Sequence, residues 1–217
     1  MPDAQIVQEA EKIANEQQLN TYEKLDKKII YGKKVVLFAF EPVDLEHFVR
    51  LHKEDAQGYM QDYCLKKMVH DEAMKFTAML FLTKQIKCWS VYLKQNSFKN
   101  LMENRRAGFI YLTNFTSFSV NISGIMDSAI MKGLLKFIRR GTKTFAQDAI
   151  ETLTQYIFDC GLERLETTVV IDNRRALALD KQCGFKEEGR LRKAFYDGSK
   201  FRDVIMLSIL KEDWNKK

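Results

Sequence analysis

The chain has 217 residues, of which 46% are hydrophobic and 12% are aromatic. This length and composition are typical of a folded domain with a substantial core, and they exclude a disordered or low-complexity chain. The net charge of +6 at pH 7 favours anionic partners, such as a phosphorylated small molecule or a nucleic acid.

The cysteines and the hydropathy of the chain further restrict the class of protein to which it can belong. Cys64, Cys88, Cys160 and Cys183 lack the paired spacing of a zinc site, so we expect reduced packing residues and no bound metal. No uncharged apolar run reaches the roughly 18 residues of a membrane span, and the polar residues 2–5 do not resemble a signal peptide. The sequence therefore predicts a cytoplasmic protein with no membrane partner.

The first 32 residues are predicted to form an N-terminal helical extension. Apolar residues recur at helical spacing between residues 6 and 30, and Gly32 ends this pattern. Such a helix packs on the domain that follows it or forms the arm of a homodimer, and the sequence leaves both alternatives open. Residues 33–217 are predicted to be a single domain.

Strands and helices alternate through the first half of that domain. Residues 34–40 are β-branched and aromatic, which predicts a strand, and Asp44 is placed to cap a helix over residues 45–53. A helical pattern follows across residues 55–84. Three strands that together form an antiparallel meander are then expected at residues 88–93, 108–112 and 119–126.

The second half contains a short helix between two strands. A strong helical pattern at residues 145–160 leads to a strand at 165–171, which ends beside Asn173. Asn173 is a good N-cap for a helix over residues 174–182, and its side-chain amide stays available to a ligand. Gly184 is placed to end that helix as a C-cap glycine.

The chain is predicted to close with a β-hairpin. Residues 186–195 and 202–209 have strand patterns, and the dipeptide Asp197-Gly198 between them is a strong turn signal. Together these elements indicate an α/β (α+β) domain built on a mixed sheet.

Two turns of the second half are suited to an anionic cofactor. The residues just before the helix at 145–160 are basic, hydroxylated or glycine, so their backbone N–H groups and charges can converge on a pyrophosphate at the helix N-terminus. They are Arg139, Arg140, Gly141, Thr142, Lys143 and Thr144. The Asn173 turn follows one strand later, so a single cofactor can bridge both turns.

Several segments share their pattern with one enzyme family. They are residues 120–127, 140–149, 161–166, 172–176, 183–192 and 198–214, and the opening at 35–52. Together they resemble the Gcn5-related N-acetyltransferase (GNAT) superfamily, and within it the branch of ribosomal-protein alanine and spermidine acetyltransferases. The resemblance covers nearly the whole chain after Gly32.

This resemblance implies a fold and a co-substrate. The implied GNAT fold has a mixed, mostly antiparallel sheet, flanked by helices and splayed between its fourth and fifth strands, which are residues 119–126 and 165–171 here. Acetyl-CoA is implied as the co-substrate in that opening. The residues implied to bind it are Ile125 and Met126 through their backbone, Arg139, Arg140, Gly141, Thr142, Lys143, Thr144, Asn173 and Ala176.

The implied reaction transfers an acetyl group to a primary amine of a protein N-terminus, a polyamine or another small molecule. The amine attacks the thioester directly, a base accepts the amine proton, an acid protonates the thiolate, and backbone donors stabilise the oxyanion. Asp127, at the end of the fourth strand, is the candidate base, and Tyr196, beside the closing hairpin, is the candidate phenol. The structural alternatives are a turn former at Asp127 and a cross-strand packing residue at Tyr196.

One departure from the family pattern leaves two rival functions open. The family loop reads Gln or Arg, two residues, Gly, one residue, then Gly or Ala. With Ala146 in the last position, Thr144 replaces the first glycine and Gly141 replaces the basic residue. Such a loop is compatible with a non-catalytic acyl-CoA-binding or interaction protein. The basic charge is compatible with acetylation of aminoacyl-tRNA, so nucleic acid is an open but less favoured partner.

Overall fold

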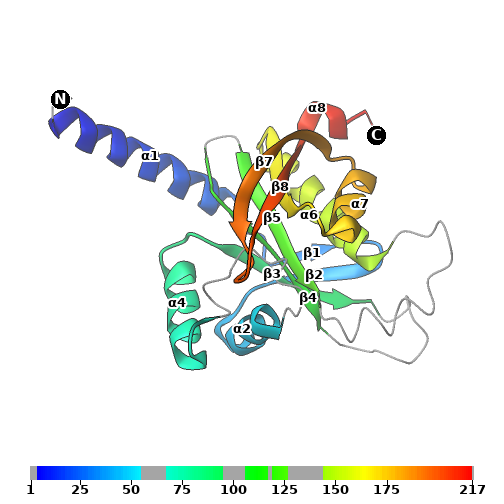
Figure 1. Cartoon of the computed structure of the whole chain (residues 1–217). Helices are drawn as coiled ribbons and strands as arrows, with labels where there is room; N and C mark the ends of the chain where they lie inside the picture. The colour runs from blue at the N-terminus through cyan, green and yellow to red at the C-terminus, as the bar shows by residue number, and fades with distance from the viewer. Residues whose placement is uncertain (1–3, 55–66, 95–105, 117–118, 127–143, 217) are drawn as a thin grey trace.

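A computed structural model describes residues 4–54, 67–94, 106–116, 119–126 and 144–216. In these ranges an eight-stranded sheet, in the order β1-β2-β3-β4-β5-β6-β8-β7, is flanked by helices (Figure 1). The elements are α1 (Ala4–Lys24), β1 (Ile29–Tyr31), β2 (Val35–Ala39), a 3-10 helix η1 (Pro42–Asp44), α2 (Leu45–Glu54), α4 (His70–Leu82), β3 (Lys87–Leu93), β4 (Arg106–Thr113), β5 (Ser119–Met126), α6 (Phe145–Asp159), β6 (Arg164–Val170), α7 (Arg174–Gln182), β7 (Lys186–Tyr196), β8 (Phe201–Leu210) and α8 (Lys211–Trp214).

The sheet divides into two antiparallel parts. Strands β1 to β5 form a meander, while β6, β8 and β7 form a second antiparallel group. The two groups meet where β5 and β6 run parallel, and there only residues 119–121 pair with residues 164–166. Because β5 continues to Met126 and β6 to Val170, the two strands diverge beyond these pairs. This confirms the mixed, mostly antiparallel sheet and its predicted splay. The strands expected as the fourth and fifth are β5 and β6, because Ile29–Tyr31 adds a strand at the start of the chain.

Alternate residues of the central strands bury two hydrophobic clusters on opposite faces of the sheet. On β4, Ile110 belongs to the larger cluster, which includes Leu153 and Ile157 of α6. Its neighbours Phe109 and Tyr111 belong to a smaller cluster with Phe48 and Leu51 of α2. This period of two is what a strand covered by helices on both faces requires. Helices α6 and α2 therefore fix the sheet from opposite sides.

The N-terminal helix is shorter than the sequence pattern indicates. It ends at Lys24, and Ile29–Tyr31, expected to be helical, instead form β1 against β2. The turn into β2 is held by the buried Asp148 carboxylate of α6, which accepts hydrogen bonds from the backbone N–H groups of Lys34 (2.6 Å) and Val35 (3.1 Å). A strand pairing and a long-range carboxylate contact thus override the local helical period.

Helix α1 projects from the body of the fold and contacts it through its last turns (Figure 1). There the Thr21 hydroxyl donates to the Thr116 carbonyl (2.6 Å), and the Tyr22 ring packs edge-on against Phe115 (5.3 Å between centroids). Ile13 and Leu19 are exposed on its outer part. The division of the chain at residue 32 and the homodimer arm both remain predictions.

Asp44 has a different role from the predicted N-cap of α2. It lies inside η1, where its carboxylate accepts hydrogen bonds from the Glu41 backbone N–H and the Ser90 hydroxyl, both at 3.0 Å. The same carboxylate pairs with the Arg106 guanidinium at 2.5 Å. Asp44 is buried, so these partners replace the water that a carboxylate loses inside a fold.

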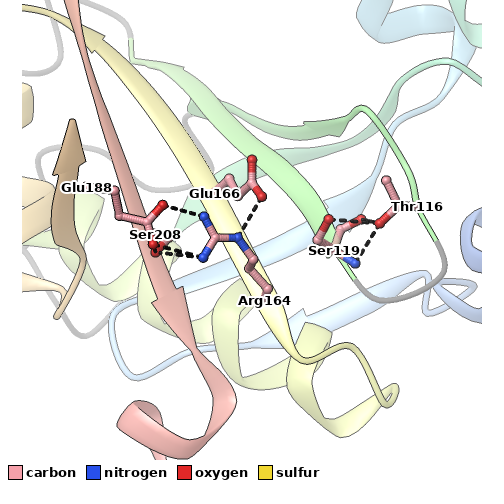
Figure 2. A network of polar contacts seen from close by, with 6 residues as sticks. All are labelled: Thr116, Ser119, Arg164, Glu166, Glu188 and Ser208. Atoms are coloured by element: carbon pink, nitrogen blue, oxygen red, sulfur yellow. Dashed lines mark hydrogen bonds and ion pairs between the residues drawn. The ribbon is translucent and has the colours of Figure 1, made fainter. Parts of the chain in front are cut away.

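A polar network secures β6 against the two closing strands, at the end where β5 and β6 still pair (Figure 2). The Arg164 guanidinium of β6 contacts Glu166 at 2.7 Å and both carboxylate oxygens of Glu188 on β7, at 2.9 and 2.5 Å. The Ser208 hydroxyl of β8 donates to Glu188 at 2.5 Å. The hydrogen bonds from Arg164, the larger contribution, and from Ser208 lower the pKa of Glu188 to about 2, below its ordinary value.

We expect the substitution Glu188→Gln to lower the free energy of unfolding by less than about 1 kcal/mol at neutral pH, because the Glu188 side chain is 40% exposed. A carboxylate whose folded pKa is depressed stabilises above its unfolded pKa and loses that effect as the pH falls toward the folded value. Urea unfolding of the wild type and the variant, from neutral pH down to about pH 3, measures this. A difference that does not shrink on acidification would contradict the expectation, and Glu212→Gln on α8 is the exposed control.

Candidate active site

A cavity of about 160 Å³ lies where β5 and β6 diverge. Five elements form its walls: β4 and β5, the facing part of β6, the first turns of α6, and one side of α7. The lining residues are Ile110, Tyr111, Ile122, Ser123, Gly124, Ala146, Ile150, Thr167, Thr168, Val169, Asn173, Ala176, Leu179 and Asp180. The wall is therefore mostly apolar, with a few polar groups from α7 and the strands.

The turn that carries Asn173 is fixed at both ends. The Asn173 backbone N–H donates to the Val170 carbonyl (2.8 Å), and the Ile171 N–H donates to the Asp203 carbonyl of β8 (3.0 Å). The Asp172 carboxylate pairs with Arg202, whose guanidinium also contacts Asp197 of the hairpin turn at 2.5 Å. The Asn173 side chain is thus presented to the cavity by a turn that cannot move without breaking these contacts.

Both predicted caps of α7 are confirmed. The Asn173 side-chain oxygen accepts a hydrogen bond from the Ala176 N–H at 3.2 Å, as an N-cap does. Gly184 has a φ of +98°, and its N–H donates to the Lys181 carbonyl, while the Phe185 N–H donates to the Asp180 carbonyl. The left-handed conformation suits glycine, which explains the helix end. These caps fix where α7 begins and ends.

Asp180 was not among the predicted site residues. Asp180 lines the cavity on the same side of α7 as Asn173 and Ala176, and it is 8% exposed. Burial raises the pKa of its carboxyl to about 7. The signal was present in the spacing, since residues three and seven positions after Asn173 lie on one helical face.

The first turn of α6 supplies the opposite wall. Thr144 is its N-cap, with a side-chain oxygen that accepts the Gln147 N–H at 3.1 Å. Ala146 and Ile150 of this helix line the cavity. The rest of the proposed pyrophosphate loop, Arg139, Arg140, Gly141, Thr142 and Lys143, lies outside the described residues, as does the candidate base Asp127.

Backbone groups on one edge of β5 complete the opening. Ile125 and Met126 pair with Phe109 and Gly108 of β4, whereas the pairing of β5 with β6 extends only to Asn121. No described strand pairs with their other edge, which therefore faces the gap between the diverging strands. A ligand that carries amide groups can pair with such an edge as another strand would.

Tyr196 is not among the residues that line the cavity. Its ring packs on Phe201 across the β7–β8 hairpin, 5.0 Å between centroids, and its hydroxyl donates to the Gly198 carbonyl at 3.2 Å. Its 41% exposed side chain has the contacts of a cross-strand packing residue. The catalytic role of Tyr196 stays a prediction.

Within the part of the chain that the structure describes, no cluster of three or more His, Cys, Asp or Glu side chains could hold a metal ion. Among the described cysteines, Cys88, Cys160 and Cys183 form no disulfide, and Cys64 lies outside the described ranges. None of the described helices combines the length and the apolar composition that crossing a membrane requires.

Comparison with known proteins in sequence gives a partial match. No protein-family model matches the chain. A stretch of 73 residues, 33% of the chain, is 32% identical to spermidine N(1)-acetyltransferase of Vibrio cholerae serotype O1. The match spans 42% of that relative, less than half of its length.

Several solved structures share the fold over most of their length. A probable acetyltransferase of the GNAT family from Chromobacterium violaceum has a TM-score of 0.64 at 19% identity, covering 87% of this chain and 88% of that one. Spermidine N-acetyltransferase from Vibrio cholerae, in complex with CoA and spermine, has a TM-score of 0.66 at 21% identity, covering 84% and 98%. A ribosomal L7/L12 alpha-N-protein acetyltransferase, in complex with coenzyme A, has a TM-score of 0.63 at 17% identity, covering 84% and 97%. These likenesses identify the fold.

Proposed function

We propose that this chain, which has the fold of the Gcn5-related N-acetyltransferase superfamily, is an acyltransferase that moves the acetyl group of acetyl-CoA to a primary amine. The observation that carries the proposal is the cavity between the diverging strands β5 and β6, walled by α6 and by the Asn173 side of α7. The complexes of two structural neighbours with coenzyme A support the choice of co-substrate.

The proposed placement of acetyl-CoA uses groups from three elements. The pantetheine arm, which contains amides, lies along the free edge of β5 at Ile125 and Met126. The pyrophosphate lies at the N-terminus of α6, with Thr144 and the basic loop before it, where helix dipole and charge both favour an anion. Asn173 and Ala176 contact the arm from the other side.

The proposed reaction forms one bond between heavy atoms, breaks another, and moves one proton. The amine nitrogen attacks the thioester carbonyl carbon, a C–N bond forms, the C–S bond breaks, and the amine loses a proton while the thiolate gains one. The assignment of Asp127 as the base rests on the resemblance to the GNAT superfamily. The amine is a polyamine or a protein N-terminus, the two classes that the names of the relatives contain.

The function is tested by two measurements on the full chain. Isothermal titration with acetyl-CoA measures binding, and thiol release measures turnover across a panel of spermidine, spermine, peptides with free N-termini and an aminoacyl-tRNA. Tight binding with no thiol release for any amine would favour a non-catalytic acyl-CoA-binding protein. Turnover of the tRNA alone, with binding that weakens steeply with salt, would favour the tRNA alternative.

Replacing Asn173 by Ala is expected to weaken acetyl-CoA binding several-fold and to lower the free energy of unfolding by about 1 kcal/mol, because the variant loses both the ligand contact and the helix cap. Asn173→Ser is the matched control, since its hydroxyl retains the cap and lacks the amide. For Asn173→Ser we expect a free energy of unfolding close to that of the wild type, measured by urea unfolding. We expect its affinity for acetyl-CoA, measured by titration, to be as low as that of the Ala variant. Wild-type affinity in both variants would remove Asn173 from the site.

A further inference from the structure

We propose that the outer half of the β7–β8 hairpin and the first turn of α7 together bind a single-stranded nucleic acid. Cations of this surface contact the phosphates, and an exposed aromatic ring stacks on a base. The residues that form it, called the hairpin surface, are Arg174, Arg175, Arg192, Lys193, Lys200 and Phe201. None of them lines the cavity, so the inference goes beyond the proposed acetyl transfer and does not depend on it.

Arg202 holds the two parts of the hairpin surface together. Its guanidinium pairs with Asp172, in the turn before α7, and with Asp197, in the turn of the hairpin, the latter at 2.5 Å. The two arginines at the start of α7 follow closely after Asp172, and Lys200 follows closely after Asp197. These ion pairs therefore place cations from distant parts of the sequence on neighbouring elements.

A bulge in β7 directs two further cations away from the strand ladder. The pairing with β8 shifts between Leu191 and Phe195, and Lys193, inside this shift, has a φ of +50°. The Lys193 backbone N–H donates to the Asp203 carboxylate at 2.8 Å, which fixes the bulge. A left-handed conformation is unfavourable for a residue with a Cβ, and such strain and such bulges are concentrated at functional sites. Here they present the exposed side chains of Arg192 and Lys193.

The acids of this region are paired, whereas most cations of the hairpin surface are not. The carboxylates before α7 and in the hairpin turn contact Arg202, and Asp203 pairs with Arg190 at 2.5 Å. The exposed cations with no hydrogen-bond or ion-pair partner for their side chains among the described residues are Arg174, Arg175, Lys193 and Lys200. The hairpin surface therefore keeps a positive charge that attracts a polyanion.

Phe201 gives the hairpin surface a flat apolar face. It is 62% exposed and directly follows Lys200, and its ring is backed by Tyr196 at 5.0 Å between centroids. An exposed ring beside cations matches a nucleotide, in which a flat base lies next to a phosphate. An acidic peptide supplies the charge without the base, and a duplex keeps its bases stacked inside. The single strand is therefore the partner that uses both the ring and the cations.

Fluorescence anisotropy tests this on the full chain, with labelled RNA and DNA single strands of about 12 nucleotides. The competitors are an RNA duplex, a polyphosphate chain and an acidic peptide, each at about 50 to 200 mM salt. We expect a single strand to bind at least about 10-fold more tightly than any competitor, and the tighter of the two strands identifies the source. A competitor that binds as tightly as both strands would overturn the proposal.

Two substitutions separate stacking from charge. Phe201→Leu keeps an apolar side chain and lacks the ring, so we expect a loss of affinity of at least about 5-fold with an unchanged salt dependence, whereas Phe201→Trp should bind like the wild type. Lys193→Gly removes a charge where φ suits glycine, so the fold is expected to persist. We expect its slope of log K against log salt to be smaller by about 0.7.

Lys12→Gln is the matched control, because Lys12 is an exposed cation on the outer part of α1, and we expect wild-type binding for it. Wild-type affinity in both Phe201→Leu and Lys193→Gly would overturn the proposal. Saturating acetyl-CoA is expected to leave the strand bound, and displacement of the strand would instead assign these cations to the co-substrate. Failure of acetyl transfer with every amine would overturn the proposed function and leave nucleic-acid binding standing.

Discussion

The substitution Ala176→Phe is expected to reduce acetyl-CoA affinity at least about 100-fold, equivalent to about 2.7 kcal/mol of binding free energy. Ala176 lines a cavity of about 160 Å³, so a phenyl ring at this position occupies the space that the ligand requires. Because the residue lies after the N-cap of α7, and its backbone N–H still donates to Asn173, we expect the helix to persist. Titration with acetyl-CoA measures the loss, and thermal unfolding shows that the fold remains.

The matched control is Ala178→Phe, the same change two residues along the same helix. Ala178 is exposed and does not line the cavity, so we expect its affinity for acetyl-CoA to stay within about 3-fold of the wild type. Equal losses in both variants would point to damage of α7 itself. Wild-type affinity in Ala176→Phe would show that acetyl-CoA binds elsewhere.

The substitution Asp180→Asn is expected to stabilise the protein relative to the wild type as the pH rises. Burial raises the pKa of Asp180 from the ordinary value of 3.8 to about 7, so the folded state holds this proton more tightly than the unfolded state. Stability is therefore lost as the pH rises from about 4 to about 7, and Asn does not titrate. A shift of about three pKa units sets an upper bound of about 4 kcal/mol on the gain.

Urea unfolding of both proteins between about pH 5 and about pH 8 measures this effect as a change in their stability difference. An amide in the cavity wall changes the free energy of unfolding by an amount that does not depend on pH. Comparing the stability difference at several pH values cancels this amount. Asp159→Asn, at an exposed position, should show no such pH dependence. A stability difference that stays constant across this range would mean that the Asp180 carboxyl is well solvated in the folded protein.

Local signals were sufficient to predict the elements around the site. The capping oxygen of Asn173 and the glycine at 184 defined α7 to the residue, and Asp197-Gly198 placed the closing hairpin. These features depend on side chains and backbone angles within a few residues of one another, which is the range that a sequence pattern describes.

Local sequence patterns did not predict the roles of residues whose contacts lie far along the chain. Asp44 looked like a helix cap, yet its ion-pair partner is Arg106, which is far along the chain in strand β4. The helix expected through residue 30 ended at Lys24 because Ile29–Tyr31 pair with β2. Asp180 was overlooked because a charged residue in a short helix is ordinarily solvated, and its burial depends on how α7 packs against α6 and the sheet.

The divergence of β5 and β6 has a consequence for how this protein can change over evolutionary time. The opening exists because a ladder of backbone hydrogen bonds stops after three residue pairs, and the groups left along β5 belong to the main chain. Main-chain groups are the same for every amino acid except proline, so substitutions can replace the side chains around them without removing them. A fold whose central opening is made this way tolerates extensive sequence drift, as the 17% to 21% identity of the structural neighbours illustrates.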